Sequence, residues 1–278
     1  MMLDNLSFLK PLSIKNKIRL GRKGDGGYII YDKLLYETDA LITYGVGYDI
    51  SFEEDFNRLT NKKVLMFDPT LFGDYLVNWK DVLKFGLRLR FVQVFILLHR
   101  GLMLWWKKKE LRGKDILFVN EGISAKKAGK YDVLSSHLKR FGQTTGRLLL
   151  KLDVEGAEYE VFNCDATYDS LANVNQLLIE FHDLKNRLRN LYMILKRLSQ
   201  DFEIIHIHAN NAGHTFLLYD LVGDGNTDKE LPDILEISLV RRELIHANDI
   251  LGLPELYPVP DLDFPCDPFK ADIKISFI

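Results

Sequence analysis

The chain has 278 residues, of which 47% are hydrophobic and 27% are charged, as is typical of a folded globular protein. Its formal net charge of −2 gives no overall field that would attract nucleic acid, so we expect no nucleic-acid partner. Cys164 and Cys266 form neither a CxxC motif nor a zinc-binding spacing, and the N-terminus has no apolar signal-peptide core. We therefore expect a cytoplasmic protein.

Seven apolar runs predict β-strands that are buried on both faces. Stretches typical of helices at 50–59, 155–163 and 184–200 lie between them. This alternation predicts a doubly wound α/β sheet in one domain over 1–278, with an insertion at 71–112. The strands are expected within 39–49, 62–70, 114–122, 147–156, 174–183, 201–211 and 233–242.

Polar or glycine residues follow these strands at the same relative place. In a doubly wound sheet, ligands bind outside the carboxyl ends of the strands, so these residues are expected to share one rim. The rim would be formed by Gly45, Gly47, Asp68, Glu121, Asp153, Glu180 and His182.

Two glycines, Gly45 and Gly47, form either a plain tight turn or a place where the backbone approaches a ligand closely. Asp68, about twenty residues further on, could accept hydrogen bonds from both ribose hydroxyls of an adenosine cofactor. The dinucleotide motif GxGxxG is not met, because Ile50 replaces its third glycine, and this disfavours a nicotinamide-dependent oxidoreductase. Asp25 lies on a loop with three glycines, which is either a cofactor-binding loop or a turn into a short strand.

The stretch "KLDVEGAEYEVF" (151–162) resembles the signature of the FkbM family of S-adenosylmethionine-dependent methyltransferases. Further matches follow the family's order over about residues 19–241, with 71–112 unmatched: "DGGY", "YGVGYDISFEEDF", "MFDPT", "LLIEFH", "HIHANN" and "PDILEISLV". The resemblance implies a Rossmann-like, seven-stranded methyltransferase sheet with its last strand antiparallel. It also implies S-adenosylmethionine as the cofactor.

The resemblance further implies roles at the cofactor. The glycine turn would receive the methionine part, and the carboxylate after the next strand would hold the ribose. Glu53 either reaches the methionine amino group or is a solvated acid of the first helical turn. Asn120 or Glu121 would lie beside the adenine. The cofactor-binding candidates are Asp25, Gly45, Gly47, Glu53, Asp68, Asn120 and Glu121.

Methyl transfer to oxygen requires that the acceptor is oriented and loses a proton. Asp153, Glu180 and His182 either bind a divalent cation (Mg or Mn), which would hold the acceptor hydroxyl and lower its pKa, or form a hydrogen-bonded cluster without a metal. Asp153 and one of two histidines, His182 or His208, are the catalytic candidates. The alternative for His206 and His208 is a structural role.

The insertion at 71–112 differs from its surroundings in charge and composition. Residues 71–114 carry ten Lys or Arg against three Asp or Glu, together with all three tryptophans. The apolar part is too interrupted for a membrane-spanning helix. The insertion is either a helical cap that packs on the domain or on a second copy in a homo-oligomer, or a helix at an anionic membrane surface.

Together these features predict an S-adenosylmethionine-dependent O-methyltransferase. The resemblance implies an acceptor hydroxyl on a sugar or glycan precursor, as in carbohydrate modification and polysaccharide biosynthesis. The alternative is a non-catalytic FkbM-like binding module docked at a membrane or a partner. If the insertion binds lipid, we expect the protein at the inner face of the membrane.

Overall fold

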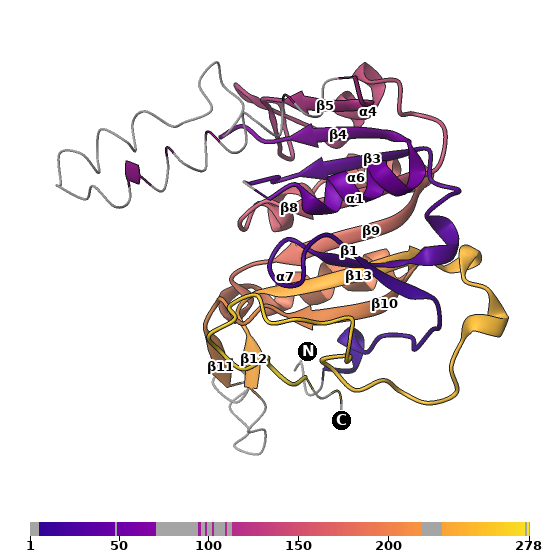
Figure 1. The fold of residues 1–278 in the computed structure, drawn as a ribbon, viewed down its shortest axis with the longest axis vertical. Helices are drawn as coiled ribbons and strands as arrows, with labels where there is room; N and C mark the ends of the chain where they lie inside the picture. Colours follow the sequence, from indigo (N-terminus) through magenta and orange to yellow (C-terminus); the bar gives the residue numbers. More distant parts are fainter. Residues whose placement is uncertain are drawn as a thin grey trace.

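The computed structural model describes residues 6–47, 49–70, 94–95, 98, 102, 109, 113–217, 230–275 and 277. Its centre is a seven-stranded sheet in the order β10-β13-β9-β8-β3-β4-β5 (Figure 1). The strands of this sheet are β3 (Ala40–Tyr44), β4 (Lys63–Phe67), β5 (Ile116–Val119), β8 (Leu148–Asp153), β9 (Val174–Phe181), β10 (Phe202–Ala209) and β13 (Leu235–Arg241).

Strand β13 runs antiparallel to both of its neighbours, β9 and β10. The other neighbouring pairs of the sheet are parallel. The seven strands lie where the apolar runs predicted them. This strand order, with the last strand antiparallel, is that of the Rossmann-like methyltransferase fold. The predicted fold class is therefore confirmed.

One face of the sheet is covered by α4 (Leu134–Arg140), α5 (Glu158–Val161), α6 (Asp165–Ser170) and α7 (Leu184–Leu198). Helix α7 has the amphipathic pattern that the sequence predicted, so one stripe packs on the sheet while the other faces solvent. Its buried residues are Leu184, Leu188, Leu191, Ile194, Leu195 and Leu198. These side chains belong to the larger of the hydrophobic clusters.

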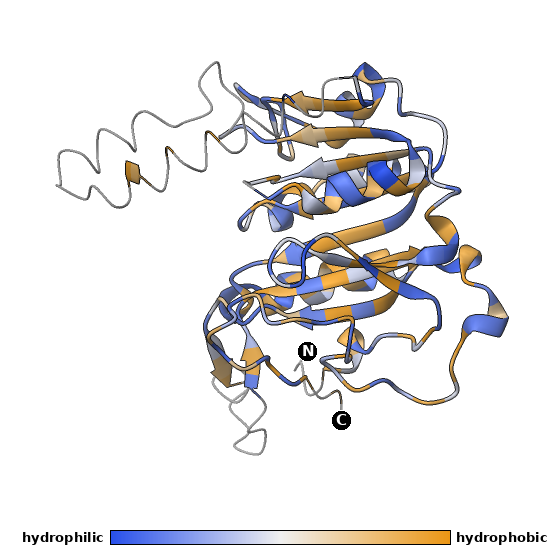
Figure 2. Ribbon diagram, viewed as in Figure 1, coloured by the Kyte–Doolittle hydropathy of each residue, from blue (hydrophilic) through white to orange (hydrophobic). Residues whose placement is uncertain are grey.

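The opposite face is covered by α1 (Ser51–Thr60) and by the hairpin of β1 (Lys17–Leu20) and β2 (Tyr28–Tyr31). Figure 1 shows β1 in front of β13, with α7 behind the sheet. The strands are mostly hydrophobic in Figure 2, whereas α1 is hydrophilic on part of its surface. Under the hairpin, however, the sheet also buries charged side chains, among them Lys151, Glu180 and Glu236.

The helix predicted at 155–163 is shorter than expected. Glu155 and Gly156 have left-handed φ angles of 55° and 98°, which end the turn after β8, so α5 contains only Glu158–Val161. The remaining elements are short: β6 (Gly122–Ile123), β7 (Tyr131–Asp132), β11 (Thr215–Leu217), β12 (Glu230–Pro232), η1 (Ser7–Leu9), η2 (Asp32–Leu34), η3 (Leu171–Asn173), η4 (Arg242–Leu244) and η5 (Ala247–Asp249).

The predicted insertion at 71–112 lies outside the described residues, apart from positions 94, 95, 98, 102 and 109. Its role as a cap, a subunit contact or a membrane contact therefore stays a prediction, as does the assignment of a single domain. Within the described ranges, no helix combines the length and the apolar character that crossing a bilayer requires.

The turn after β3 distinguishes two glycines. A Cβ atom on Gly45 would lie 1.4 Å from the carbonyl oxygen of Asp153, whereas a Cβ on Gly47 would meet nothing within 4 Å. Both residues have left-handed φ angles, of 76° and 58°. We predict that Gly45→Ala lowers the free energy of unfolding by about 3 kcal/mol or more, and Gly47→Ala by only about 1–2 kcal/mol. Urea denaturation of the two variants measures this difference, and equal losses would contradict the close approach.

Candidate functional site

A cavity of about 600 Å³ lies at the carboxyl ends of the central strands and is lined by two groups of residues. One group follows β3, β4 and β5: Gly45, Gly47, Phe67, Asp68, Gly122, Ile123 and, from β7, Tyr131. The other comes mainly from β8, β9 and the loop before β2: Asp25, Lys151, Asp153, Glu155, Glu180, His182 and Asn210. The structure thus brings most of the predicted rim into one space.

Asp68 is held firmly against the wall of the cavity. Its Oδ2 accepts a hydrogen bond from the backbone N–H of Gly47 at 3.2 Å. Its Oδ1 accepts from the backbone N–H and the Oγ1 of Thr70, at 2.8 and 2.6 Å. A carboxylate has about four acceptor positions, so Asp68 keeps capacity for a ligand hydroxyl while it fixes the glycine turn.

Asn120 and Glu121 do not line the cavity, in contrast to their predicted place beside an adenine. Asn120 Oδ1 accepts a hydrogen bond from Lys130. Glu121 accepts from Arg140 Nη1 at 3.1 Å and from His137 Nε2 at 3.1 Å, both on α4. These contacts direct Glu121 toward the helix. The bond from Arg140, helped by that from His137 and opposed by burial, lowers the pKa of Glu121.

Glu53 is also absent from the cavity lining. It is only 1% exposed, and its Oε1 accepts a hydrogen bond from Thr43 Oγ1 at 2.9 Å and lies 4.0 Å from Lys151 Nζ. Burial raises the pKa of Glu53, although the charge of Lys151 opposes the shift. Glu53 therefore stabilises the charged form of Lys151 without lining the cavity itself.

Lys151 is the buried cation of the site. Its Nζ lies 3.8 Å from Asp153 Oδ2 and 4.7 Å from the centre of the Tyr28 ring, a cation–π contact. Burial alone would lower the pKa of Lys151, but the charges of Glu53, Asp153 and Glu180 outweigh it and raise the pKa. The charged form of Lys151 is thus favoured at the side of the cavity that Asp153 and Glu180 line.

Tyr28 joins the two carboxylates of the site. Its hydroxyl oxygen lies 2.9 Å from Asp153 Oδ2 and 2.9 Å from Glu180 Oε2. A hydroxyl donates only one hydrogen, so both contacts are hydrogen bonds only if one carboxylate carries a proton. Burial, together with the charges of Asp153 and Glu236, raises the pKa of Glu180 well above its usual value. Tyr28 thus contacts both carboxyl groups of the site.

His182 lies among carboxylates at the cavity. Its Nδ1 is 2.9 Å from Glu158 Oε1, and its Nε2 is 3.9 Å from both Asp153 Oδ1 and Glu180 Oε1. Burial opposes the charged imidazolium, but the hydrogen bond to Glu158 and the surrounding charges outweigh it and raise the pKa of His182 to about 9. Glu158 also accepts the backbone N–H of Val154, so it fixes the imidazole and the turn together.

His208, the other predicted base, does not line the cavity. Its Nδ1 lies 3.2 Å from Glu236 Oε2, and its Nε2 lies 3.3 Å from Asp272 Oδ1. Burial opposes its charged form, but Glu236 and the hydrogen bond to Asp272 raise the pKa of His208. His206 is likewise buried and contacts Asp263. The alternative of a structural role therefore suits this pair better than proton removal.

Asp153, Glu180 and His182 could hold a metal, because one ligand atom from each lies within 4.8 Å of the others. Two carboxylate oxygens and an imidazole are suitable ligands for Mn or Mg. Three carboxyl groups, those of Asp153, Glu158 and Glu180, lie within 3.9 Å of His182. A divalent cation fits this charge, and Asp153, Glu180 and His182 would hold it.

Sequence reasoning missed four polar residues that line the cavity or contact Asp153, Glu180 or His182: Tyr28, Lys151, Glu158 and Asn210. Lys151 and Glu158 lie inside the stretch "KLDVEGAEYEVF", and Tyr28 ends "DGGY", so the motifs contained them. Asn210 Nδ2 donates to Glu180 Oε1 at 2.9 Å. Asp25, which was predicted, lines the cavity, and burial and the charges of Glu236 and Asp153 raise its pKa.

No protein-family model matches the chain. A search of curated proteins found no relative either. Membership of the FkbM family is therefore not confirmed and stays a prediction.

Solved structures with a similar fold include an rRNA methylase from Streptococcus thermophilus, at 11% identity and a TM-score of 0.38, covering 75% of this chain and 90% of the other. A putative tRNA (m1A22) methyltransferase from Streptococcus pneumoniae, in complex with S-adenosyl-L-methionine, has 12% identity, a TM-score of 0.36 and coverages of 75% and 69%. A precorrin-6y C5,15-methyltransferase from Geobacter metallireducens has 10% identity, a TM-score of 0.35 and coverages of 80% and 94%. At these identities the likeness concerns the fold alone.

The expectation that nucleic acid is excluded as a partner was wrong. It is contradicted by the rRNA and tRNA methyltransferases among the similar structures. The physical reason is that net charge averages over the whole surface, whereas a nucleic-acid contact depends on the local distribution of charge.

Tyr28→Phe removes only the hydroxyl that links Asp153 and Glu180. We predict a loss of about 1–3 kcal/mol in the free energy of unfolding, because the buried carboxyl group of Glu180 and the half-buried one of Asp153 lose a partner. Urea denaturation measures it, with Tyr36→Phe, at a residue 64% exposed, as the control. Unchanged stability in Tyr28→Phe would show that the hydroxyl does not bond these carboxylates.

Glu121→Gln tests whether Glu121 is bound to Arg140 on α4. Because the pKa of Glu121 is lowered from 4.5 in the folded chain, its contribution to stability is present above about pH 4.5 and is lost as the pH falls through the folded pKa. We expect a loss of about 0.5–1 kcal/mol at pH 7 that shrinks toward pH 4. A double-mutant cycle with Arg140→Leu, followed by urea denaturation, isolates the pair. A coupling free energy that does not change with pH would contradict this account.

Proposed function

We propose that the protein is an S-adenosylmethionine-dependent O-methyltransferase. One observation carries the proposal: Gly47 and Asp68 open onto the same cavity as Asp153, Glu180 and His182. A methyl donor held by the first pair would thus meet an acceptor held by the other three. Ligands bind at this edge in sheets of this class, which supports the placement.

The donor half suits an adenosine cofactor. Asp68 offers acceptor positions for ribose hydroxyls, and Phe67, Ile123 and Tyr131 supply apolar and aromatic surface for a planar base. Because Gly47 has no side chain, the methionine part of the cofactor could lie directly against its backbone. In this proposal Glu53, Asn120 and Glu121 are not cofactor contacts.

The acceptor half suits a molecule with several hydroxyl groups. It presents the carboxylates of Asp25, Asp153 and Glu180 and the amide of Asn210 within one cavity. Carboxylates accept hydrogen bonds from hydroxyl groups, and the amide can both donate and accept. This lining, together with the FkbM resemblance, supports a sugar or glycan precursor as the acceptor class.

Transfer forms an O–CH₃ bond while the S–CH₃ bond of the sulfonium breaks, and the acceptor hydroxyl loses its proton. Of the two predicted histidine bases only His182 lines the cavity, but its pKa of about 9 favours the protonated imidazolium near neutral pH, so Asp153 is the proton-accepting group. Lys151 and Tyr28 position Asp153, and Glu158 positions His182. A divalent cation bound by Asp153, Glu180 and His182 would lower the pKa of the acceptor hydroxyl.

The cofactor half is tested by calorimetry with S-adenosylhomocysteine. Asp68→Ala should weaken binding by about 1–3 kcal/mol, because ribose hydroxyls lose a buried acceptor. Asp115→Ala is the matched control and should bind normally. Asp115 is exposed and lies just before β5, at the amino ends of the strands and so away from the cavity. Unchanged affinity in Asp68→Ala would remove Asp68 from the site.

The transfer itself is tested with S-adenosylmethionine labelled in its methyl group and a panel of monosaccharides, nucleotide sugars, glycan fragments and short RNAs. We expect labelled sugar or glycan, and loss of turnover in Asp153→Asn with cofactor affinity retained. Labelled RNA alone would refute the sugar class. Cofactor binding without any product would favour a non-catalytic module, and a fully active Asp153→Asn would refute the acceptor site.

A further inference from the structure

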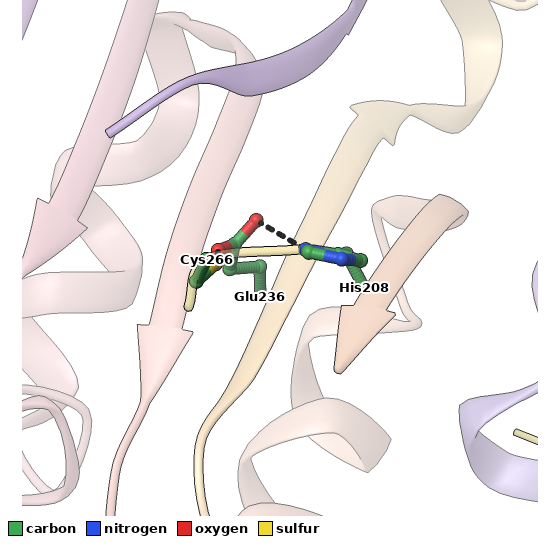
Figure 3. Close-up of side chains that lie close together, drawn as sticks. All are labelled: His208, Glu236 and Cys266. Carbon is green, nitrogen blue, oxygen red and sulfur yellow. Dashed lines mark hydrogen bonds and ion pairs between the residues drawn. The ribbon is translucent and has the colours of Figure 1, made fainter. Parts of the chain in front are cut away.

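A second cluster of potential ligands lies outside the cavity lining. It consists of His208 on β10, Glu236 on β13 and Cys266 in the C-terminal segment (residues 250–275) (Figure 3). The three residues are only 2%, 6% and 7% exposed. Figure 3 shows their side chains pointing toward one another from separate parts of the chain. One ligand atom from each lies within 4.8 Å of the other two.

Two of the separations, each to a different oxygen of Glu236, are close to those between neighbouring ligands of a tetrahedral zinc ion. His208 Nδ1 lies 3.2 Å from Glu236 Oε2, and Cys266 Sγ lies 3.5 Å from Glu236 Oε1. Zinc bonds of about 2.0 Å to nitrogen or oxygen and 2.3 Å to sulfur, at tetrahedral angles, separate neighbouring ligands by about 3.3–3.5 Å. The third pair, His208 and Cys266, has ligand atoms within 4.8 Å of each other, so side-chain rotation would complete the set.

The other ring nitrogen of His208 also has the contact that zinc-binding histidines usually make. His208 Nε2 lies 3.4 Å from Asp272 Oδ2 and can donate its hydrogen to this carboxylate. A carboxylate behind the imidazole fixes the ring and leaves Nδ1 with its lone pair directed at the metal. Asp272 thus gives an observation independent of the three ligands.

Glu236 is paired with His208 across neighbouring strands, and a zinc ion would replace the proton between them. In the part of the chain that the structure describes, its hydrogen-bond partners are His208 and the weakly donating thiol of Cys266. Buried carboxylates are costly unless they are paired or coordinate a metal. Thiolate, imidazole and carboxylate together are the ligand types that zinc accepts. We propose that His208, Glu236 and Cys266 bind a zinc ion that fastens the C-terminal segment to the sheet.

Over its described residues, the C-terminal segment lacks the regular hydrogen bonding of secondary structure. Residues 250–275 contain no helix or strand in the described structure. The segment is held to the sheet edge partly by Asn211, whose Nδ2 donates to the carbonyl oxygens of Asp267, Lys270 and Ala271. An ion shared by β10, β13 and Cys266 would add a cross-link at the same place, and zinc would displace the thiol and imidazole protons when it binds.

Cobalt substitution tests the proposal without any assay of activity. The full chain is stripped of metal with a chelator and titrated with Co²⁺, and the thiolate-to-cobalt charge-transfer absorption is recorded. We expect a band that saturates at about one Co²⁺ per chain and disappears when Zn²⁺ is added. Absence of the band in the wild-type chain would overturn the proposal.

Three variants locate the site. Cys266→Ser should abolish the band, whereas Cys164→Ser, at the other cysteine of the chain, should retain it. Asp272→Asn keeps all three ligands and should bind Co²⁺ about 10–100-fold more weakly. Circular dichroism verifies that each variant is folded. A band that survives in Cys266→Ser, or an unchanged affinity in Asp272→Asn, would refute the assignment. If Cys266→Ser does not fold, Asp272→Asn and the wild-type titration still decide.

Discussion

A row of acidic side chains at the carboxyl edge of the sheet is the constraint on which the rest of the structure depends. Asp153, Glu180 and Glu236 are register partners across β8, β9 and β13, so their side chains lie next to one another on one face. Neighbouring buried carboxylates are stable only with protons or positive charges beside them. Lys151 and His182 supply this charge at one end of the row, and the hydroxyl of Tyr28 links Asp153 and Glu180.

The same row of acidic residues connects the cavity with the cluster of His208, Glu236 and Cys266. Glu236 is the register partner of both Glu180 and His208, so the acidic row continues into the His208–Glu236–Cys266 cluster. The charge of Glu236 also contributes to the raised pKa of Glu180. Each end of the row thus has a histidine in contact with carboxylates. We propose that one end binds the methyl acceptor and that the other binds the zinc ion that holds the C-terminal segment.

The strands and the shared rim could be predicted from the sequence because continuous apolar runs identify buried strands and their last residues identify one edge. The side-chain partners could not. Glu121 lies two residues after β5, yet it contacts Arg140 and His137 on α4 instead of lining the cavity. His208 has the spacing of a site residue, but its partners are Glu236 and Asp272, 28 and 64 residues further along the chain. Such long-range contacts leave no local pattern in a single sequence.

The central claim is that donor and acceptor share one cavity, and a crystal structure with S-adenosylhomocysteine tests it most directly. The account predicts the ribose at Asp68 and the sulfur directed across the cavity toward Asp153. The close approach of Gly45 to the Asp153 carbonyl keeps these two halves together. Density for the ligand outside this cavity, or a sulfur separated from Asp153 by protein atoms, would contradict the account.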